Sequence, residues 1–251
     1  MPLARSVSIA VLLALAALWP PPARAFGAAS KFTFAVIRHG GNFDPRPTGL
    51  ERIAWEVEKR TSVEVSLEPK IIDLTDPDLF NYPFLVLTGD GDFPPFSEAE
   101  REALRRHLTF GGFLLVDDAS GQPGGPFDQA ARRELRAILP NAKIGRIPKE
   151  HVLYKSFYLL DGPTGRVQAA TAADGIDLSG RLAVVFSPND LEGAAARDSF
   201  GNWEMEVTPG GELQREHAFR FGINLVMYAL CLDYKDDQVH VPFIMQRRHW
   251  P

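Results

Sequence analysis

Continuous apolar runs alternate with amphipathic segments along the chain, and together they predict buried strands covered by helices. Residues 84–87, 113–116 and 182–186 are almost entirely apolar, as expected of parallel strands that are buried on both faces. The segment 31–37 is rich in β-forming residues and predicts the first strand. Residues 62–67 alternate between apolar and polar, which favours a strand near the sheet edge.

Capping signals predict where the helices begin and end. Residues 48–51 (Thr-Gly-Leu-Glu) and 97–100 (Ser-Glu-Ala-Glu) both have the capping-box spacing, in which a hydroxyl and a carboxylate satisfy free amides of the first turn. The first helix should run to about residue 60, and the glycines at 111–112 should end the second.

A third helix is predicted from Asp128, as its cap, to the stop at Pro140. Residues 212–232 predict a long helix that is amphipathic at first and then apolar all round. Between these helices, residues 141–180 carry scattered prolines and glycines and give only weak strand predictions, such as 167–171. The polar, glycine-bearing excursion 187–211 has the length of a functional or mobile segment.

Strands that alternate with capped helices predict an α/β fold with a doubly wound, mostly parallel sheet in a three-layer αβα arrangement. We expect residues 26–251 to form a single domain. A C-terminal tail from about residue 233 is expected to pack across its surface.

The N-terminal 25 residues predict a signal peptide. Arg5 supplies a positive charge, an apolar run covers 7–19, and residues 23–25 (Ala-Arg-Ala) give the small-x-small cleavage pattern. The chain is therefore expected to be exported, either periplasmic or secreted, and an uncleaved N-terminal anchor is the alternative. No later segment suits a membrane span, because the best candidate, 219–232, is too short and contains Asn224.

Charge and cysteine usage exclude some partners. The formal net charge is −5, and loss of residues 1–25 removes two arginines and no acid. An acidic chain without a basic stripe argues against nucleic acid and anionic membrane surfaces. The single cysteine, Cys231, cannot form an intramolecular disulfide and is expected to be buried as a small hydrophobe. A reactive thiol or an intermolecular bridge is the alternative.

Polar side chains gather where predicted strands end, which is where open α/β sheets bind ligands. Asp117 and Asp118 alternate along their strand, so only one of them can face a given side. The alternative is that such aspartates cap turns by bonding local amides, and that the histidine after the first strand is an ordinary loop residue. The candidate rim of a ligand site comprises His39, Asp90, Asp92, Asp117, Asp118, Asn189 and Asp190, and His151 could reach the same crevice.

Common catalytic signatures are missing. The sequence has no GxSxG elbow, no cysteine at such an elbow, no metal motif such as HExxH or CxxC, and no phosphate-binding glycine loop. We therefore expect no cofactor and no metal. Aromatic residues near the rim could contact a carbohydrate or peptide, although core packing is the alternative; these are Phe93, Phe96, Phe157, Tyr158 and Trp203.

Six segments resemble the prokaryotic domain-of-unknown-function family 4159. They are YPFLVLTGDGDFPPFSEAE, GGFLLVDD, HVLYKSFYLL, LAVVFSPNDLEG, FRFGINLVMYAL and the tail YKDDQVHVPFIMQRRHW. The resemblance implies a flavodoxin-like sheet of the class I glutamine amidotransferase type. In true amidotransferases the strand at 113–116 leads into a nucleophilic cysteine, where this chain has Asp117 and Asp118. Family members in some bacteria belong to membrane-anchored proteins, which implies a cell-envelope complex as a partner.

These observations predict an exported, non-catalytic domain of the bacterial cell envelope that binds a polar ligand or a partner segment, with its oligomeric state left open. The alternative is a hydrolase of an envelope glycan or peptide, with Asp118 or Asp92 as general base and His39 as acid. A third hypothesis is a scaffold that docks a membrane complex through 187–211 and the tail.

Overall fold

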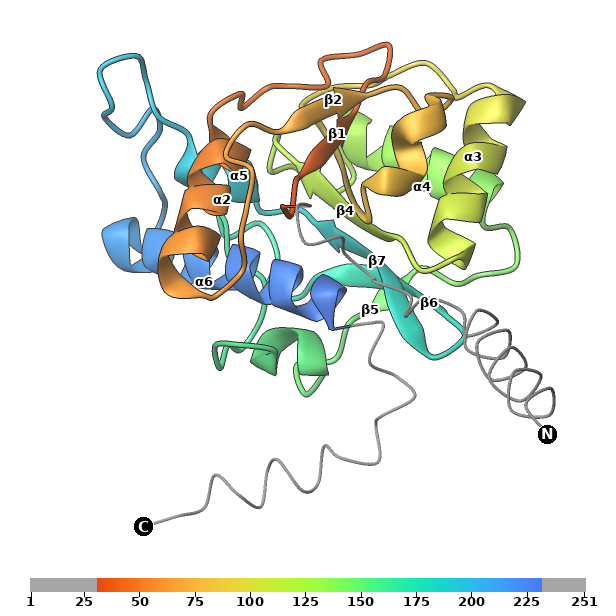
Figure 1. Ribbon diagram of the computed structural model, residues 1–251. Helices are drawn as coiled ribbons and strands as arrows, with labels where there is room; N and C mark the ends of the chain where they lie inside the picture. Colours follow the sequence, from red (N-terminus) through yellow and green to blue (C-terminus); the bar gives the residue numbers. More distant parts are fainter. Residues whose placement is uncertain (1–30, 232–251) are drawn as a thin grey trace, which may run out of the picture. The chain divides into compact units, whose positions relative to one another are not determined.

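The computed structural model describes residues 31–231, which form a seven-stranded sheet with the order β2-β1-β3-β4-β7-β6-β5 (Figure 1). Neighbours from β2 to β7 are parallel, whereas β6 is antiparallel to β7 and β5 to β6. The strands are β1 (Ala35–Ile37), β2 (Lys70–Ile72), β3 (Phe84–Gly89), β4 (Phe113–Asp118), β5 (Gly145–Arg146), β6 (Asp174–Leu178) and β7 (Arg181–Ser187).

Helices cover both faces of this sheet. On one face α2, α5 and α6 pack against one another, and on the other α3 packs against α4. The predicted α/β fold with a mostly parallel, doubly wound sheet is confirmed, and it is compatible with a flavodoxin-like three-layer fold. The helices are α2 (Gly49–Arg60), α3 (Glu98–Thr109), α4 (Pro126–Ile138), α5 (Leu191–Ala195) and α6 (Gly211–Leu230), with 3-10 turns η1 (Pro77–Asn81) and η2 (Val152–Lys155).

The central strands divide their side chains between two cores, because successive residues of a strand point to opposite faces. Val86, Leu115 and Val185 belong to the core beneath α2, α5 and α6. Their neighbours Leu87 and Val116 belong to the core beneath α3 and α4. Burial on both sides explains why these strands read as unbroken apolar runs.

The capping box at the start of α3 is confirmed. The Ser97 hydroxyl accepts the Glu100 N–H at 3.3 Å, and the Glu100 carboxylate accepts the Ser97 N–H at 2.7 Å. Ser97 and Glu100 are only three residues apart, so this motif can be recognised from the sequence alone.

The predicted capping box at Thr48 and Glu51 is wrong, although α2 does begin there. The Thr48 hydroxyl bonds both the N–H and the C=O of Arg197, at 2.8 and 3.0 Å, and makes no cap bond to α2. A side chain on Gly49 would lie 2.6 Å from the Glu192 carbonyl oxygen. The start of α2 therefore packs directly against α5. The Thr48 hydroxyl bonds Arg197, just after α5, and is not available to cap α2.

Three other boundaries differ from the predictions. The edge strand lies at β2 rather than at 62–67, where only Val65 forms a bridge, to Phe32. Helix α4 begins at Pro126 after Gly125, and Asp128 lies in its first turn, where its carboxylate accepts the Gly124 N–H. The weak strand candidate 167–171 is irregular, and the strand beside β7 is β6.

The first part of the segment 187–211 packs into the molecule, whereas most of residues 199–210 are exposed. It contains α5, whose five residues are all buried, and Val207 belongs to the core beneath α6. The long C-terminal helix is confirmed as α6. None of the helices within residues 31–231 is long and apolar enough to span a bilayer. The predicted signal peptide and the tail from about residue 233 lie outside the described residues.

Candidate functional site

A buried polar row crosses the carboxyl ends of three central strands. Thr88 of β3, Asp117 of β4 and Ser187 of β7 are register partners and have no exposed surface. The Asp117 carboxylate accepts the N–H groups of Leu191 and Glu192, both at 2.9 Å. Asp117 thus bonds the free amides at the start of α5, as an N-cap residue would, although it lies on a neighbouring strand.

Asp190 connects α5 to two arginines. Its backbone is left-handed, with φ 53°, and its carboxylate accepts the Gly193 N–H at 2.9 Å. Arg46 pairs with the same carboxylate at 3.1 Å, and Arg166 also bonds it. Since Asp190 is fully buried, these partners compensate a charge that would otherwise be costly to bury.

Asp117 and Glu192 form a buried acid pair beside Asp190. Burial, followed by the nearby Asp190 charge, raises the pKa of Asp117 to about 7. Burial also raises the pKa of Glu192 well above its ordinary value, with the charges of Asp117 and Asp190 adding to the effect. Because Asp117 accepts two amide N–H groups while Glu192 Oε1 has no partner within the described residues, we place the proton on Glu192 and the negative charge on Asp117.

Asp118 points to the opposite face of β4, toward α4. One carboxylate oxygen accepts the Ser120 N–H at 2.9 Å and the Ser120 hydroxyl at 2.6 Å. The other, Oδ2, is buried and has no hydrogen-bond partner within residues 31–231. Burial also raises the pKa of Asp118. Among the buried rim residues of the described range it is the one with an unpartnered carboxylate oxygen.

His39 bonds the backbone through both ring nitrogens. Nε2 lies 2.8 Å from the Thr88 carbonyl oxygen, and Nδ1 accepts the Gly41 N–H at 3.1 Å. A carbonyl needs a donor and an amide N–H needs an acceptor, so the ring is held neutral with its proton on Nε2. Burial lowers the pKa of His39, in agreement with this state. Both nitrogens are therefore engaged in joining the loop after β1 to β3.

Asp90 and Asp92 lie exposed in the loop after β3. Asp90 accepts a bond from the Asn42 amide at 2.9 Å, and Asp92 accepts the Phe93 N–H at 2.8 Å. Asp92 also faces Arg133 at 3.4 Å. The Asn42–Asp90 bond joins the loops after β1 and β3, where the strand order reverses and where such folds commonly bind ligands.

Asn189 positions the loops near the end of β7. Its amide group donates to the Pro163 and Ala170 carbonyls, and its side-chain oxygen accepts the Ala170 N–H. Of the predicted rim residues, the structure brings Asp117 and Asp190 together around α5. The four aspartates 90, 92, 117 and 118 do not share one open crevice, because the first two are exposed and the last two are buried on opposite faces of β4.

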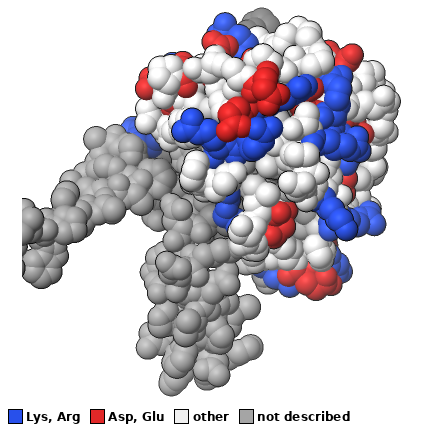
Figure 2. Space-filling model, turned by 90° about the vertical axis from the view of Figure 1, so that its right-hand side faces the viewer, with Lys and Arg blue, Asp and Glu red and all other residues white. Residues whose placement is uncertain are grey.

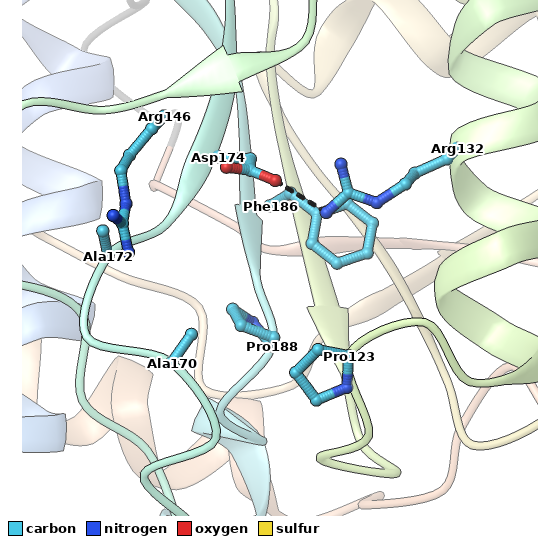
Figure 3. A pocket seen from close by; sticks show the side chains of 8 residues that line it. All are labelled: Pro123, Arg132, Arg146, Ala170, Ala172, Asp174, Phe186 and Pro188. Atoms are coloured by element: carbon cyan, nitrogen blue, oxygen red, sulfur yellow. Dashed lines mark hydrogen bonds and ion pairs between the residues drawn. The ribbon is translucent and has the colours of Figure 1, made fainter.

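A pocket of about 220 Å³ opens at the carboxyl ends of β4 and β7 (Figure 3). Its charged residues are Arg132 from α4, Arg146 from β5 and Asp174 from β6. The guanidinium of Arg132 lies 4.6 Å from the Phe186 ring centroid. The remaining walls are small or apolar, formed by Pro123, Ala170, Ala172 and Pro188.

Sequence reasoning missed these pocket residues. Arg146 lies on a two-residue strand, and such a strand gives no periodic signal. Arg132 shows only helical spacing to Asp128, which indicates a surface ion pair. The position of Pro188 directly after β7 was the available signal, because strand ends are where pockets form in this fold class.

His151 and Cys231 are not where the sequence indicated. His151 packs against Tyr228, with ring centroids 5.6 Å apart, and the Tyr228 hydroxyl accepts the Leu182 N–H near the start of β7. His151 therefore lies toward the amino end of β7, away from the strand-end rim. Cys231 is exposed at the end of α6, so the prediction of a buried thiol is wrong.

The aromatic residues near the rim divide between core and surface. Phe93 and Phe96 are buried in the core beneath α3 and α4, as the core-packing alternative expects. Tyr158 and Trp203 are partly buried against the other core, whereas Phe157 is 42% exposed.

Two further observations limit the chemistry of the described residues. In the range 31–231 no group of three or more His, Cys, Asp or Glu residues is arranged to hold a metal ion. On the face shown in Figure 2, basic and acidic side chains lie side by side rather than in one basic area. Such a mixed surface offers no broad positive field of the kind that attracts nucleic acid.

Comparison with known proteins places the chain by family. Residues 33–230 match the sequence model of a family described as Domain of unknown function (DUF4159). The match confirms the resemblance predicted from the sequence segments, although it ends before the tail that was counted among them. No curated protein matches the chain.

Proposed function

The chain belongs to the family Domain of unknown function (DUF4159), and from its geometry we propose that it is a non-catalytic binding domain of the bacterial cell envelope. The site of binding in this proposal is the pocket at the ends of β4 and β7, which would hold a polar ligand. The envelope location follows from the predicted signal peptide of residues 1–25 and is part of the proposal.

One observation carries this proposal. Most predicted acid and base groups at the strand ends already bond other parts of the protein. Asp117 bonds the start of α5 and Asp190 pairs with two arginines. His39 bonds the backbone through both ring nitrogens. A general acid or base must instead reach the substrate proton within hydrogen-bond distance. The neighbouring pocket combines charged groups with apolar walls, as small-molecule sites do.

Filling the pocket tests the proposal. Ala172 lines it, so Ala172→Phe should block it, whereas Ala99→Phe makes the same change on the exposed surface of α3. We expect sugars, short peptides or organic acids from an envelope extract to raise the melting temperature of the wild-type full chain and of Ala99→Phe, but not of Ala172→Phe. Equal shifts in all three proteins, or no shift in any, would count against this pocket as the binding site.

A hydrolase remains the second candidate because of Asp118. Its buried, unpartnered Oδ2 and its raised pKa are properties that general acids and bases share. The same geometry leaves His39 without a free nitrogen, so a hydrolytic mechanism would need another acid. Asp118→Asn preserves the shape of the side chain and removes its proton chemistry. Hydrolysis of an envelope glycan or peptide by the wild type, lost in Asp118→Asn, would favour the enzyme.

A further inference from the structure

The two arginines of the pocket differ in how their charges are compensated. Arg132 donates to Asp128 and to Asp174, both at 2.7 Å, and stacks on Phe186. Its positive charge is thus matched by two carboxylates and by an aromatic face. Arg132 is therefore part of the pocket wall, and its charge is already compensated before any ligand binds.

Arg146 has no such compensation. Its side chain makes no ion pair or hydrogen bond with any residue of the described range, and it is exposed. Asp174 is its direct cross-strand partner, and opposite charges at such positions commonly pair. Here Asp174 turns toward Arg132 instead, and Arg146 extends along the opposite wall (Figure 3).

A solvated surface arginine is the ordinary explanation for an unpaired guanidinium, and the surroundings of Arg146 argue against it. Apart from the paired Arg132 and Asp174, the residues that line the pocket with Arg146 are two prolines, two alanines and Phe186. Prolines have no N–H to offer a ligand, and alanine side chains have no polar atom. The guanidinium is therefore the main donor available to an anion in this pocket.

We propose that the pocket binds a small monocarboxylate, with the carboxylate on Arg146 and a short apolar body against Pro123, Pro188 and Phe186. This inference rests on the proposed binding function and adds the ligand class. A guanidinium binds a carboxylate through two parallel hydrogen bonds. The pocket volume of about 220 Å³ is below that of drug-sized sites, which limits the apolar body to a short chain or a small ring. Asp174 also lines the pocket, and its carboxylate repels a second negative charge, which disfavours dicarboxylates and phosphate.

The test is an NMR titration of the full chain with butyrate, with butyramide as its neutral counterpart, and with inorganic phosphate. We expect butyrate to shift the amide resonances of residues that line the pocket. Butyramide and phosphate should bind at least about tenfold more weakly, because butyramide carries no charge and phosphate has no apolar body. Arg146→Gln should weaken butyrate binding by about tenfold or more, and Arg146→Lys by less. Arg136→Gln, which removes an exposed arginine of α4 outside the pocket lining, should leave binding unchanged.

The possible failures separate the two claims. Equal pocket shifts with butyrate and butyramide, or undiminished binding in Arg146→Gln, would overturn the carboxylate inference while leaving the binding function in place. Preferential binding of phosphate would overturn it in the same way. Absence of any pocket shift with butyrate would overturn it as well, and the Ala172→Phe experiment would then decide the binding function on its own.

Discussion

Asp117 and Asp118 are adjacent in sequence, yet the structure gives them different roles. The Asp117 carboxylate holds the start of α5 through two backbone N–H groups. Within residues 31–231, Asp118 bonds only Ser120 and has one buried oxygen without a partner. Alternation along β4 separates them, because it directs successive side chains to opposite helical layers. The carboxyl end of β4 thus presents one acid that fastens a neighbouring helix and one acid with an unpartnered oxygen within the described residues.

Asp117→Asn should destabilise the fold. The N–H groups of Leu191 and Glu192 bond different oxygens of the carboxylate. The amide replaces one of these oxygens with an NH₂ donor, so at least one N–H would lose its partner, at a cost of about 1–3 kcal/mol. Urea denaturation monitored by circular dichroism measures the loss. The exposed Asp92→Asn is the matched control and should change the free energy of unfolding by no more than about 0.5 kcal/mol. A loss in the control as large as that in Asp117→Asn would contradict the assigned role.

Glu192 predicts a pH dependence of stability. Its folded-state pKa is raised by burial, so the folded protein holds a proton that the unfolded chain releases above about pH 4.3. Stability from this group is complete at lower pH and is lost as pH rises through the folded pKa. Glu192→Gln cannot ionise and escapes this loss. The melting temperature of Glu192→Gln minus that of the wild type should therefore become larger as the pH rises from about 5 to about 8. A constant difference across that range would show that Glu192 is already ionised at the lower pH.

At the scale of elements, Asn224 of α6 holds in place the η2 segment, by which we mean η2 and the residues that follow it up to Tyr158. Its side-chain oxygen accepts the N–H groups of Phe157 and Tyr158, and its amide donates to the Tyr158 carbonyl. Its backbone carbonyl also accepts the Ser156 hydroxyl. The polar residue that interrupts the apolar run of the last helix is thus an anchor for a segment nearly seventy positions earlier.

Asn224→Ala would leave these backbone groups of the η2 segment without partners. We expect a loss on the order of 3 kcal/mol and faster hydrogen exchange at the Tyr158 amide, because the local segment opens more readily. Asn81→Ala removes a comparable amide from an exposed position, where it bonds only Asp78, and should have little effect. Unchanged exchange at Tyr158 in Asn224→Ala would argue that packing alone holds the segment.

The elements that could be predicted are those decided by nearby residues. The Ser97 box and the central strands follow from spacing and from uninterrupted apolar runs, and both are found as expected. Thr48 has the same local signal but bonds Arg197, 149 positions away, and sequence spacing cannot reveal such a partner. The same limit applies to the candidate site. Strand-end residues could be located, but the commitment of Asp174 to Arg132, which frees Arg146, depends on three elements meeting in space.

At the scale of the whole molecule, the carboxyl edge of the sheet combines a closed part and an open part. Near β1 and β3, His39 and the pair Asn42–Asp90 join the neighbouring loops. At β4 and β7 the edge opens into the pocket lined by Arg132 and Arg146. A fold family does not determine function, which has to be argued from such a site. The geometry favours binding because the open part holds charged and apolar groups, while most of the acids and the histidine lie in bonded positions.

The central claim is that the chain binds a small ligand without transforming it. The most direct measurement is an NMR experiment on the full chain with an envelope extract that contains short organic acids and peptides, in which protein and ligand signals are followed together. The account predicts shifts confined to residues around the pocket, their loss in Ala172→Phe, and ligand signals that stay constant with time. Steady conversion of a ligand into a new product, abolished by Asp118→Asn and retained in Ala172→Phe, would contradict it.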